Sequence, residues 1–124
     1  MQNRFASALS NYQTARKYNA QFIFLIHDLW GADGTQNASA PYPGDDGDWT
    51  SWDEFLTLWI SDMNANEATA GLSVDIWNEP DGTAFWNAPQ AQYLQMWGRT
   101  YHRLRLALLV DCQSFFPCII LYFS

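Results

Sequence analysis

Phe22-Ile23-Phe24-Leu25-Ile26 is an unbroken run of apolar residues rich in β-forming side chains. Such a run predicts a strand that is buried on both faces, inside a parallel sheet covered by helices on each side. The polar residues His27 and Asp28 follow the run directly. They therefore mark the carboxyl end of the predicted strand.

Helical periodicity appears on both sides of this strand. One helix is expected from about residue 3 to 18, and Asn19, which tolerates a positive φ, is a suitable stop. A second helix is expected to start near Thr50, where Ser51 and Glu54 predict a capping box. Its apolar positions recur at helical spacing and predict a core-facing stripe of Trp52, Phe55, Leu56, Trp59, Ile60 and Met63.

A second strand is predicted over residues 72–77. A third helix is expected after Asn87, and the apolar positions placed on one face are Leu94, Trp97, Tyr101 and Leu104. The order is therefore helix, strand, helix, strand, helix. Two strands joined by a helix form a parallel βαβ unit, so the sequence predicts the α/β fold class.

The second predicted strand runs into Trp77-Asn78-Glu79-Pro80-Asp81. In parallel α/β sheets, ligands bind and catalytic residues lie at the carboxyl ends of strands. A carboxyl between Trp77 and Pro80 is expected to be partly desolvated, which favours the protonated form that a general acid needs. Asn78 both donates and accepts hydrogen bonds. The alternative is a surface turn that simply leaves the strand.

Trp77-Asn78-Glu79-Pro80 after an apolar strand resembles the strand-4 motif of the clan A glycoside hydrolases, and residues 75–81 are most similar to the family 39 β-xylosidase-like group. These are retaining (β/α)₈-barrel enzymes. The resemblance covers about residues 1–105 and implies a partial TIM barrel, from helix 2 to helix 4, including strands 3 and 4. It also implies a parent hydrolase that acts on polysaccharide or oligosaccharide, from a mostly extracellular family.

The resemblance implies a role for each matching residue. Glu79 would be the general acid/base, and Asn78 would hydrogen-bond the sugar 2-hydroxyl. His27 and Asp28 would bind substrate, although a structural hydrogen bond is an equal alternative for His27. Aromatic residues near the strand ends are candidates for stacking on sugar rings or for core packing: Trp30, Trp49, Trp77 and Trp86. No cofactor or metal is expected, because the spacing of Asp45, Asp46 and Asp48 fits a solvated loop better than a calcium site.

The chain also departs from the family pattern. A retaining glycosidase needs a second carboxylate about 5–5.5 Å from the acid/base, on a strand that residues 1–105 do not include. We therefore expect a barrel fragment without hydrolytic activity of its own, whose open sheet edges favour aggregation or association. Residues 106–124 form an apolar tail with one charge and both cysteines, which is interpreted as translated intron or frame-shifted sequence.

Charge and composition limit the classes of molecule that the chain is expected to bind. The 124 residues carry a formal charge of −7, and no Lys or Arg occurs between Tyr18 and Gly98. Such an acidic centre repels phosphate, so nucleic acid and anionic membranes are poor partners. A neutral sugar is a better candidate, because it can stack on the aromatic rings of a chain with seven Trp. Two alternatives stay open: a non-catalytic carbohydrate-binding remnant, and a remnant tethered to a membrane by the tail. The chain starts without the apolar run of a signal peptide, and its location stays open.

Overall fold

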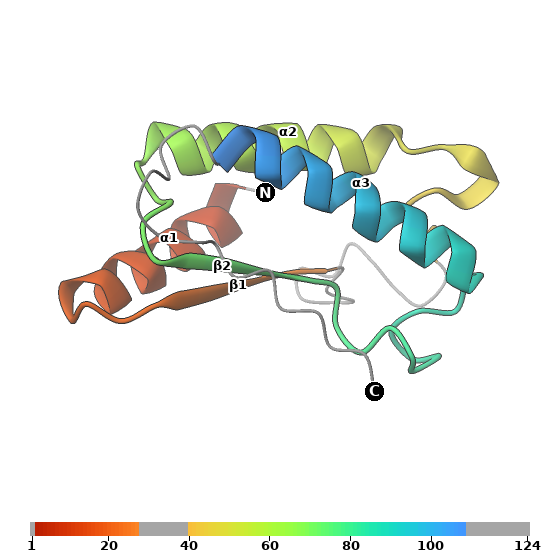
Figure 1. Cartoon of the computed structure of the whole chain (residues 1–124), viewed down its shortest axis with the longest axis horizontal. Coiled ribbons are helices and arrows are strands. Elements are labelled where there is room, and N and C mark those ends of the chain that lie inside the picture. The colour runs from red at the N-terminus through yellow and green to blue at the C-terminus, as the bar shows by residue number, and fades with distance from the viewer. Residues whose placement is uncertain (1, 28–39, 109–124) are drawn as a thin grey trace.

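A computed structural model describes residues 2–27 and 40–108 of the chain (Figure 1). Its elements are α1 (Gln2–Lys17), β1 (Phe22–Ile26), the short 3₁₀ turn η1 (Asp45–Gly47), α2 (Thr50–Ala65), β2 (Leu72–Ile76) and α3 (Gln90–Leu108). β1 and β2 pair in parallel, with Phe22 opposite Leu72 and Ile26 opposite Ile76. The predicted α/β order and the parallel pairing of its two strands are therefore confirmed.

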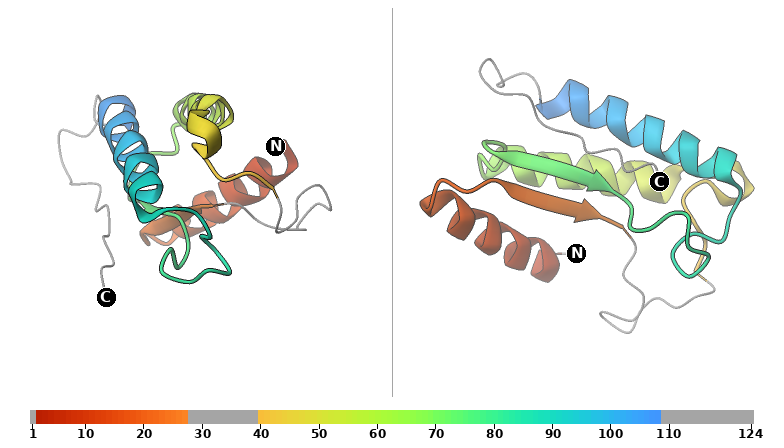
Figure 2. Two further views of the ribbon diagram at one scale, coloured as in Figure 1. Left: turned by 90° about the vertical axis from the view of Figure 1, so that its right-hand side faces the viewer. Right: turned by 60° about the horizontal axis from the view of Figure 1, so that its bottom comes forward.

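The helices cover one face of this sheet. Phe22 contacts Tyr12 of α1, with ring centroids 5.9 Å apart, and Phe24 contacts Trp59 of α2 at 5.1 Å. Both phenylalanines lie on the same face of β1 because side chains alternate along a strand. In Figures 1 and 2, α3 runs alongside α2, and α1 lies beside β1. The core therefore lies between this face of the sheet and the three helices.

The opposite face of β1 is open, which corrects the prediction of a strand buried on both faces. Ile23 is 57% exposed and Leu25 is 37% exposed. Both faces of β1 carry large apolar side chains, so polar and apolar residues do not alternate in its sequence. Among the described residues, however, the helices pack against only one of these two faces. Within the described residues, each strand of this two-stranded sheet also has one unpaired edge. Unpaired edges of this kind are sites for pairing with another strand.

Two helices end in the same way, with a residue in the left-handed region. Asn19 (φ 56°) follows α1, and the N–H groups of Asn19 and Ala20 donate to the carbonyls of Arg16 and Ala15 at 3.1 and 3.0 Å. This pair of bonds is a Schellman motif, and it confirms Asn19 as the predicted stop. Glu67 (φ 52°) takes the equivalent position after α2.

The start of α2 differs from the predicted capping box. The helix begins at Thr50 as expected, but its cap residue, Trp49, makes no side-chain hydrogen bond. Instead, Asp48 Oδ1 accepts a hydrogen bond from the Thr50 N–H at 2.8 Å. This bond, together with a side-chain bond from Thr50, lowers the pKa of the exposed Asp48 carboxyl. The capping interaction predicted for Ser51 and Glu54 is therefore wrong, because the cap residue is Trp49 and Ser51 already lies inside the helix.

The core-facing stripe of α2 is confirmed. Four of its residues are buried (Trp52, Leu56, Trp59 and Met63), and Phe55 and Ile60 pack against them. On α3 the buried residues are Met96, Thr100, Leu104 and Leu108. Leu94 is 48% exposed, which corrects its predicted place on the buried face. Two residues turn a helix by about 200°, so Leu94 lies on the other side from Met96.

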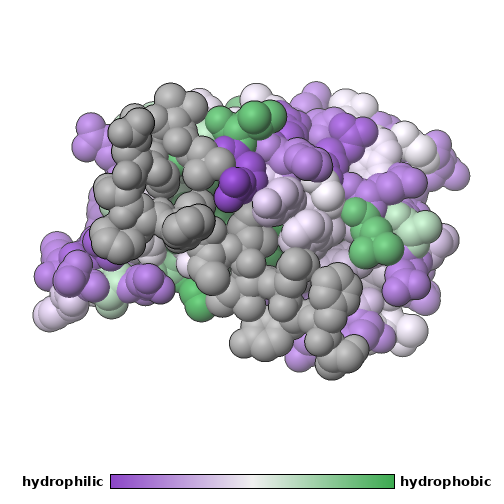
Figure 3. Space-filling model, in the orientation of Figure 1, coloured by the Kyte–Doolittle hydropathy of each residue, from purple (hydrophilic) through white to green (hydrophobic). Residues whose placement is uncertain are grey.

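Helix α3 continues three residues past Arg105, into the predicted tail, and Leu108 is buried in the core. The rest of the tail, residues 109–124, lies outside the described part of the chain. None of the described helices is long and apolar enough to cross a membrane. On the face shown in Figure 3, hydrophilic residues predominate and apolar patches are separate.

Candidate functional site

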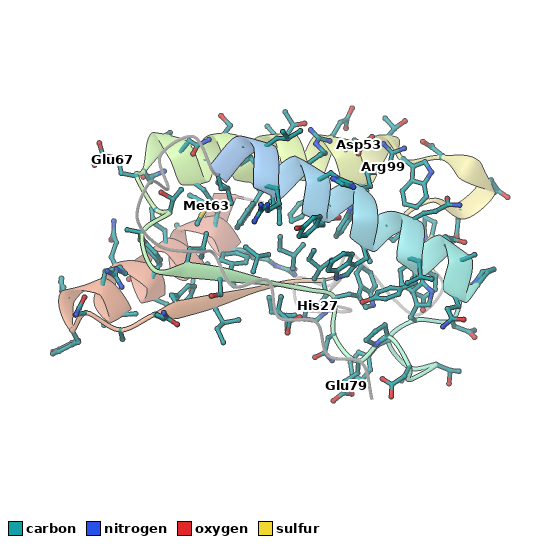
Figure 4. The ribbon with its side chains drawn as sticks, in the orientation of Figure 1. His27, Asp53, Met63, Glu67, Glu79 and Arg99 are labelled. Atoms are coloured by element: carbon teal, nitrogen blue, oxygen red, sulfur yellow. The ribbon has the colours of Figure 1, made fainter. Side chains whose placement is uncertain are left out.

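The candidate site lies at the carboxyl ends of β1 and β2. Ile26 is opposite Ile76, so the two strands end at the same level. His27 follows β1, and Trp77, Asn78 and Glu79 follow β2. Figure 4 shows His27 and Glu79 at this end of the sheet. The predicted substrate-binding residues Asp28 and Trp30 lie outside the described residues.

Trp77 anchors the segment that carries the predicted catalytic residues. It is only 4% exposed, and its Nε1 donates to the Phe85 carbonyl at 3.0 Å. Its backbone N–H donates to the Ile26 carbonyl at 2.8 Å, which extends the sheet by one bond. So little exposed surface does not suit Trp77 for stacking on a sugar. Its place is instead in the core, where it fixes the exit of β2.

The backbone around Trp77 is strained. Trp77 has φ 73° and Glu79 has φ 41°, both in the left-handed region that non-glycine residues rarely adopt. Each such residue costs about 1–3 kcal/mol and persists only where its surroundings hold it. Here the buried indole and the Trp77 hydrogen bonds do so. Strain of this kind concentrates at functional sites.

Glu79 stands at the start of a turn. The Gly82 N–H donates to the Glu79 carbonyl at 2.9 Å, and Pro80 takes the second position of the turn, where proline is favoured. The Glu79 side chain is exposed and Asn78 is half-buried. The expected partial desolvation of Glu79 by Trp77 and Pro80 is therefore wrong, because Trp77 turns into the core rather than over the carboxyl.

Asp75 is a candidate residue that was missed in the sequence. It lies in β2 opposite Leu25 and is half-buried, and it interacts electrostatically with His27. Burial raises the pKa of the Asp75 carboxyl, and the nearby His27 partly offsets this. The signal was present as a single carboxylate inside an apolar strand. That carboxylate lies two residues before Trp77.

Aromatic side chains pack together next to the ends of the two strands. Trp86 is buried and contacts Trp77, Tyr42 and Tyr93, with ring centroids 5.1, 4.9 and 5.5 Å apart. The Tyr93 hydroxyl donates to the Ile76 carbonyl at 3.4 Å. Burial and the charge of Asp75 both raise the Tyr93 pKa, so its phenol is neutral. Of the two interpretations of Trp86, core packing is the one that fits.

Trp49 and the acidic loop beside it have structural contacts. The Arg99 guanidinium lies 5.0 Å from the centre of the Trp49 ring. Asp45 accepts hydrogen bonds from the Tyr42 N–H at 2.8 Å and from Gln92 Nε2 at 2.7 Å. In the described part of the chain, no group of three or more His, Cys, Asp or Glu could hold a metal ion. The acidic loop therefore ties η1 to α3.

The other two glutamates lie elsewhere. Glu54 is exposed on α2, and Glu67 follows the far end of α2. In Figure 4, Glu67 and Glu79 are at opposite ends of the sheet. Within the described ranges, Glu79 is thus the only glutamate at the strand ends that also carry His27.

Comparison of the chain with family models, with curated proteins and with solved structures found no match.

Proposed function

We propose that this chain is part of a retaining O-glycosidase barrel in which Glu79 is the general acid/base. The observation that carries the proposal is the position of Asn78 and Glu79 directly after β2, level with His27 at the end of β1. In (β/α)₈ barrels, catalytic residues project from this end of the strands. The parallel strands and the helices on one outer face are what a segment of such a barrel contains.

The roles follow from the chemistry of glycoside hydrolysis. The Glu79 carboxyl protonates the leaving glycosidic oxygen and afterwards takes a proton from the attacking water. The amide of Asn78 hydrogen-bonds a sugar hydroxyl next to the cleaved bond, and this bond strengthens in the transition state. The turn that begins at Glu79 and the anchored Trp77 keep both side chains at the end of the sheet. The substrate is a polysaccharide or oligosaccharide.

A nucleophile is also required. The covalent glycosyl-enzyme intermediate forms on a second carboxylate about 5–5.5 Å from the acid/base. In the part that the structure describes, Glu54 and Glu67 lie away from Glu79. We therefore propose that the strands of residues 1–105 hydrolyse glycosides only together with a strand that supplies this carboxylate.

A non-catalytic carbohydrate-binding protein is the second candidate function. The exposed Glu79 without a nearby glutamate partner favours it for the described part of the chain. In this case the ligand contacts are the same, but no bond is cleaved. The half-buried Asn78 and the strand-end His27 then act only as hydrogen-bonding groups.

Oligosaccharide binding to the full 124-residue chain tests where the ligand lies. A panel of β-linked oligosaccharides is titrated while tryptophan fluorescence or heat of binding is recorded. We expect Asn78→Ala and Glu79→Gln to weaken binding. Glu67→Gln is the matched control, because Glu67 is also exposed and also has a positive φ but lies at the opposite end of the sheet. Binding that none of these changes affects would remove the strand ends as the site.

A further inference from the structure

Two titratable side chains lie on the same face of the sheet, near the carboxyl ends of its two strands. Asp75 of β2 lies opposite Leu25 of β1, and His27 follows Leu25 by two residues along the chain. Side chains two residues apart share a face, so this register places the Asp75 carboxyl beside the His27 imidazole. The two groups interact electrostatically. The His27 ring also meets the buried Trp77 ring edge to face, with centroids 6.5 Å apart.

We propose that Asp75 is a positioning residue that holds the imidazole of His27 in its charged, hydrogen-bond-donating form at the strand ends. A carboxylate accepts a hydrogen bond from one ring nitrogen and favours the imidazolium over the neutral ring. The charged ring carries an N–H on each of its two nitrogens. Contact of this ring with a sugar rests on the proposed function, whereas the Asp75–His27 pair does not.

The surroundings suit Asp75 for this role. It lies within a hydrogen-bonded strand and is half-buried, so its carboxyl has little conformational freedom. Tyr93 of α3 faces Asp75 but is neutral, because burial and Asp75 itself raise its pKa. Glu79 and Asp81, in the loop that follows β2, are exposed. Among the described residues, Asp75 is thus the half-buried carboxylate that lies next to His27.

The chain offers a direct test, because it has only two histidines. In the full chain with isotope-labelled histidine, NMR follows both imidazoles as the pH is changed, and the exposed His102 is the internal reference. We expect Asp75→Asn to lower the titration midpoint of His27 by at least about half a pH unit and to leave His102 unchanged. Asp62→Asn, which removes a half-buried carboxylate from α2, is the control and should move neither.

The reverse measurement decides the matter even if Asp75→Asn fails to fold. Coupling between two sites is reciprocal, so His27→Gln should raise the pKa of the Asp75 carboxyl, followed by its carbon resonance. A His27 midpoint unchanged in folded Asp75→Asn, or an Asp75 pKa unchanged in His27→Gln, would overturn the proposal.

An added oligosaccharide separates this proposal from the proposed function. If the pair is coupled but the sugar leaves the His27 resonance unmoved, the pair stands and the carbohydrate site fails. If the sugar moves His27 while Asp75→Asn does not change its midpoint, the carbohydrate site stands and the role of Asp75 is refuted.

Discussion

Thr100→Val tests whether a buried hydrogen bond joins α2 and α3. Trp52 Nε1 donates to Thr100 Oγ1 at 2.8 Å, and that hydroxyl donates to the Met96 carbonyl at 2.8 Å. Thr100 has no exposed surface, and Trp52 is 9% exposed. Valine has nearly the same shape as threonine, so the change removes the acceptor of Trp52 without opening a cavity.

The cost follows from leaving the indole N–H unpaired. A buried donor that loses its partner costs about 1–3 kcal/mol of unfolding free energy. We expect Thr100→Val to destabilise the chain by that amount in urea unfolding followed by circular dichroism. Thr100→Ser keeps the hydroxyl and removes one methyl group, which costs about 0.8 kcal/mol.

A double-mutant cycle isolates the pair. In a Trp52→Phe background there is no indole N–H left to satisfy, so Thr100→Val should cost clearly less than it does alone. The reasoning is refuted if Thr100→Val is no more destabilising than Thr100→Ser, or if its cost is the same in both backgrounds.

Further changes give separate expectations. Gly44→Ala should destabilise the chain by about 2 kcal/mol or more in urea unfolding, because a Cβ at this positive φ would clash with the Trp49 ring, whereas Gly47→Ala, which has a positive φ but open space, should cost only about 1 kcal/mol; equal losses would contradict this. Glu67→Gly should raise the unfolding free energy by about 0.5 kcal/mol, since glycine adopts φ 52° without the strain of a side chain, and a clear loss of stability would argue against the Schellman end of α2. Burial raises the pKa of Asp75, so the folded state binds more protons than the unfolded chain between the unfolded and folded pKa values, and stability from this group is lost as the pH rises through the folded pKa. The stability of Asp75→Asn relative to the unchanged chain should therefore improve as the pH rises above about 4, the unfolded value, and a pH-independent difference would contradict the shift.

Much of the fold could be predicted because local patterns and tertiary packing agree. The stripe on α2 follows from helical periodicity, the stop at Asn19 from the conformational preference of asparagine, and the strands from short apolar runs. The face of α3 was harder, since Leu94 is apolar yet points away from the Met96 and Leu104 side. An apolar stripe shows which residues are suited to burial, but the neighbouring helix decides which of them are covered.

The candidate site was predictable in position but not in environment. The alternation of elements placed Asn78 and Glu79 at a strand end, and the structure has them there. The exposure of Glu79 depends on Trp77, which has a positive φ and turns its side chain into the core. The residues next to Trp77 in the sequence do not reveal this conformation. Asp75 required the register between the strands, because only that pairing brings it to His27.

Turnover by the Glu79→Gln variant is the most direct test of the central claim. The transcript is sequenced through and beyond the codon for Arg105, and the polypeptide that it encodes is assayed on glycosides with poor and with activated aryl leaving groups. With a strand that supplies the nucleophile, we expect Glu79→Gln to lower turnover of the poor leaving groups by about 10²–10⁴-fold. Activated leaving groups need no protonation, so their cleavage should suffer much less. Equal turnover by the variant and the unchanged polypeptide on both substrates would contradict the assignment of Glu79 as the general acid/base.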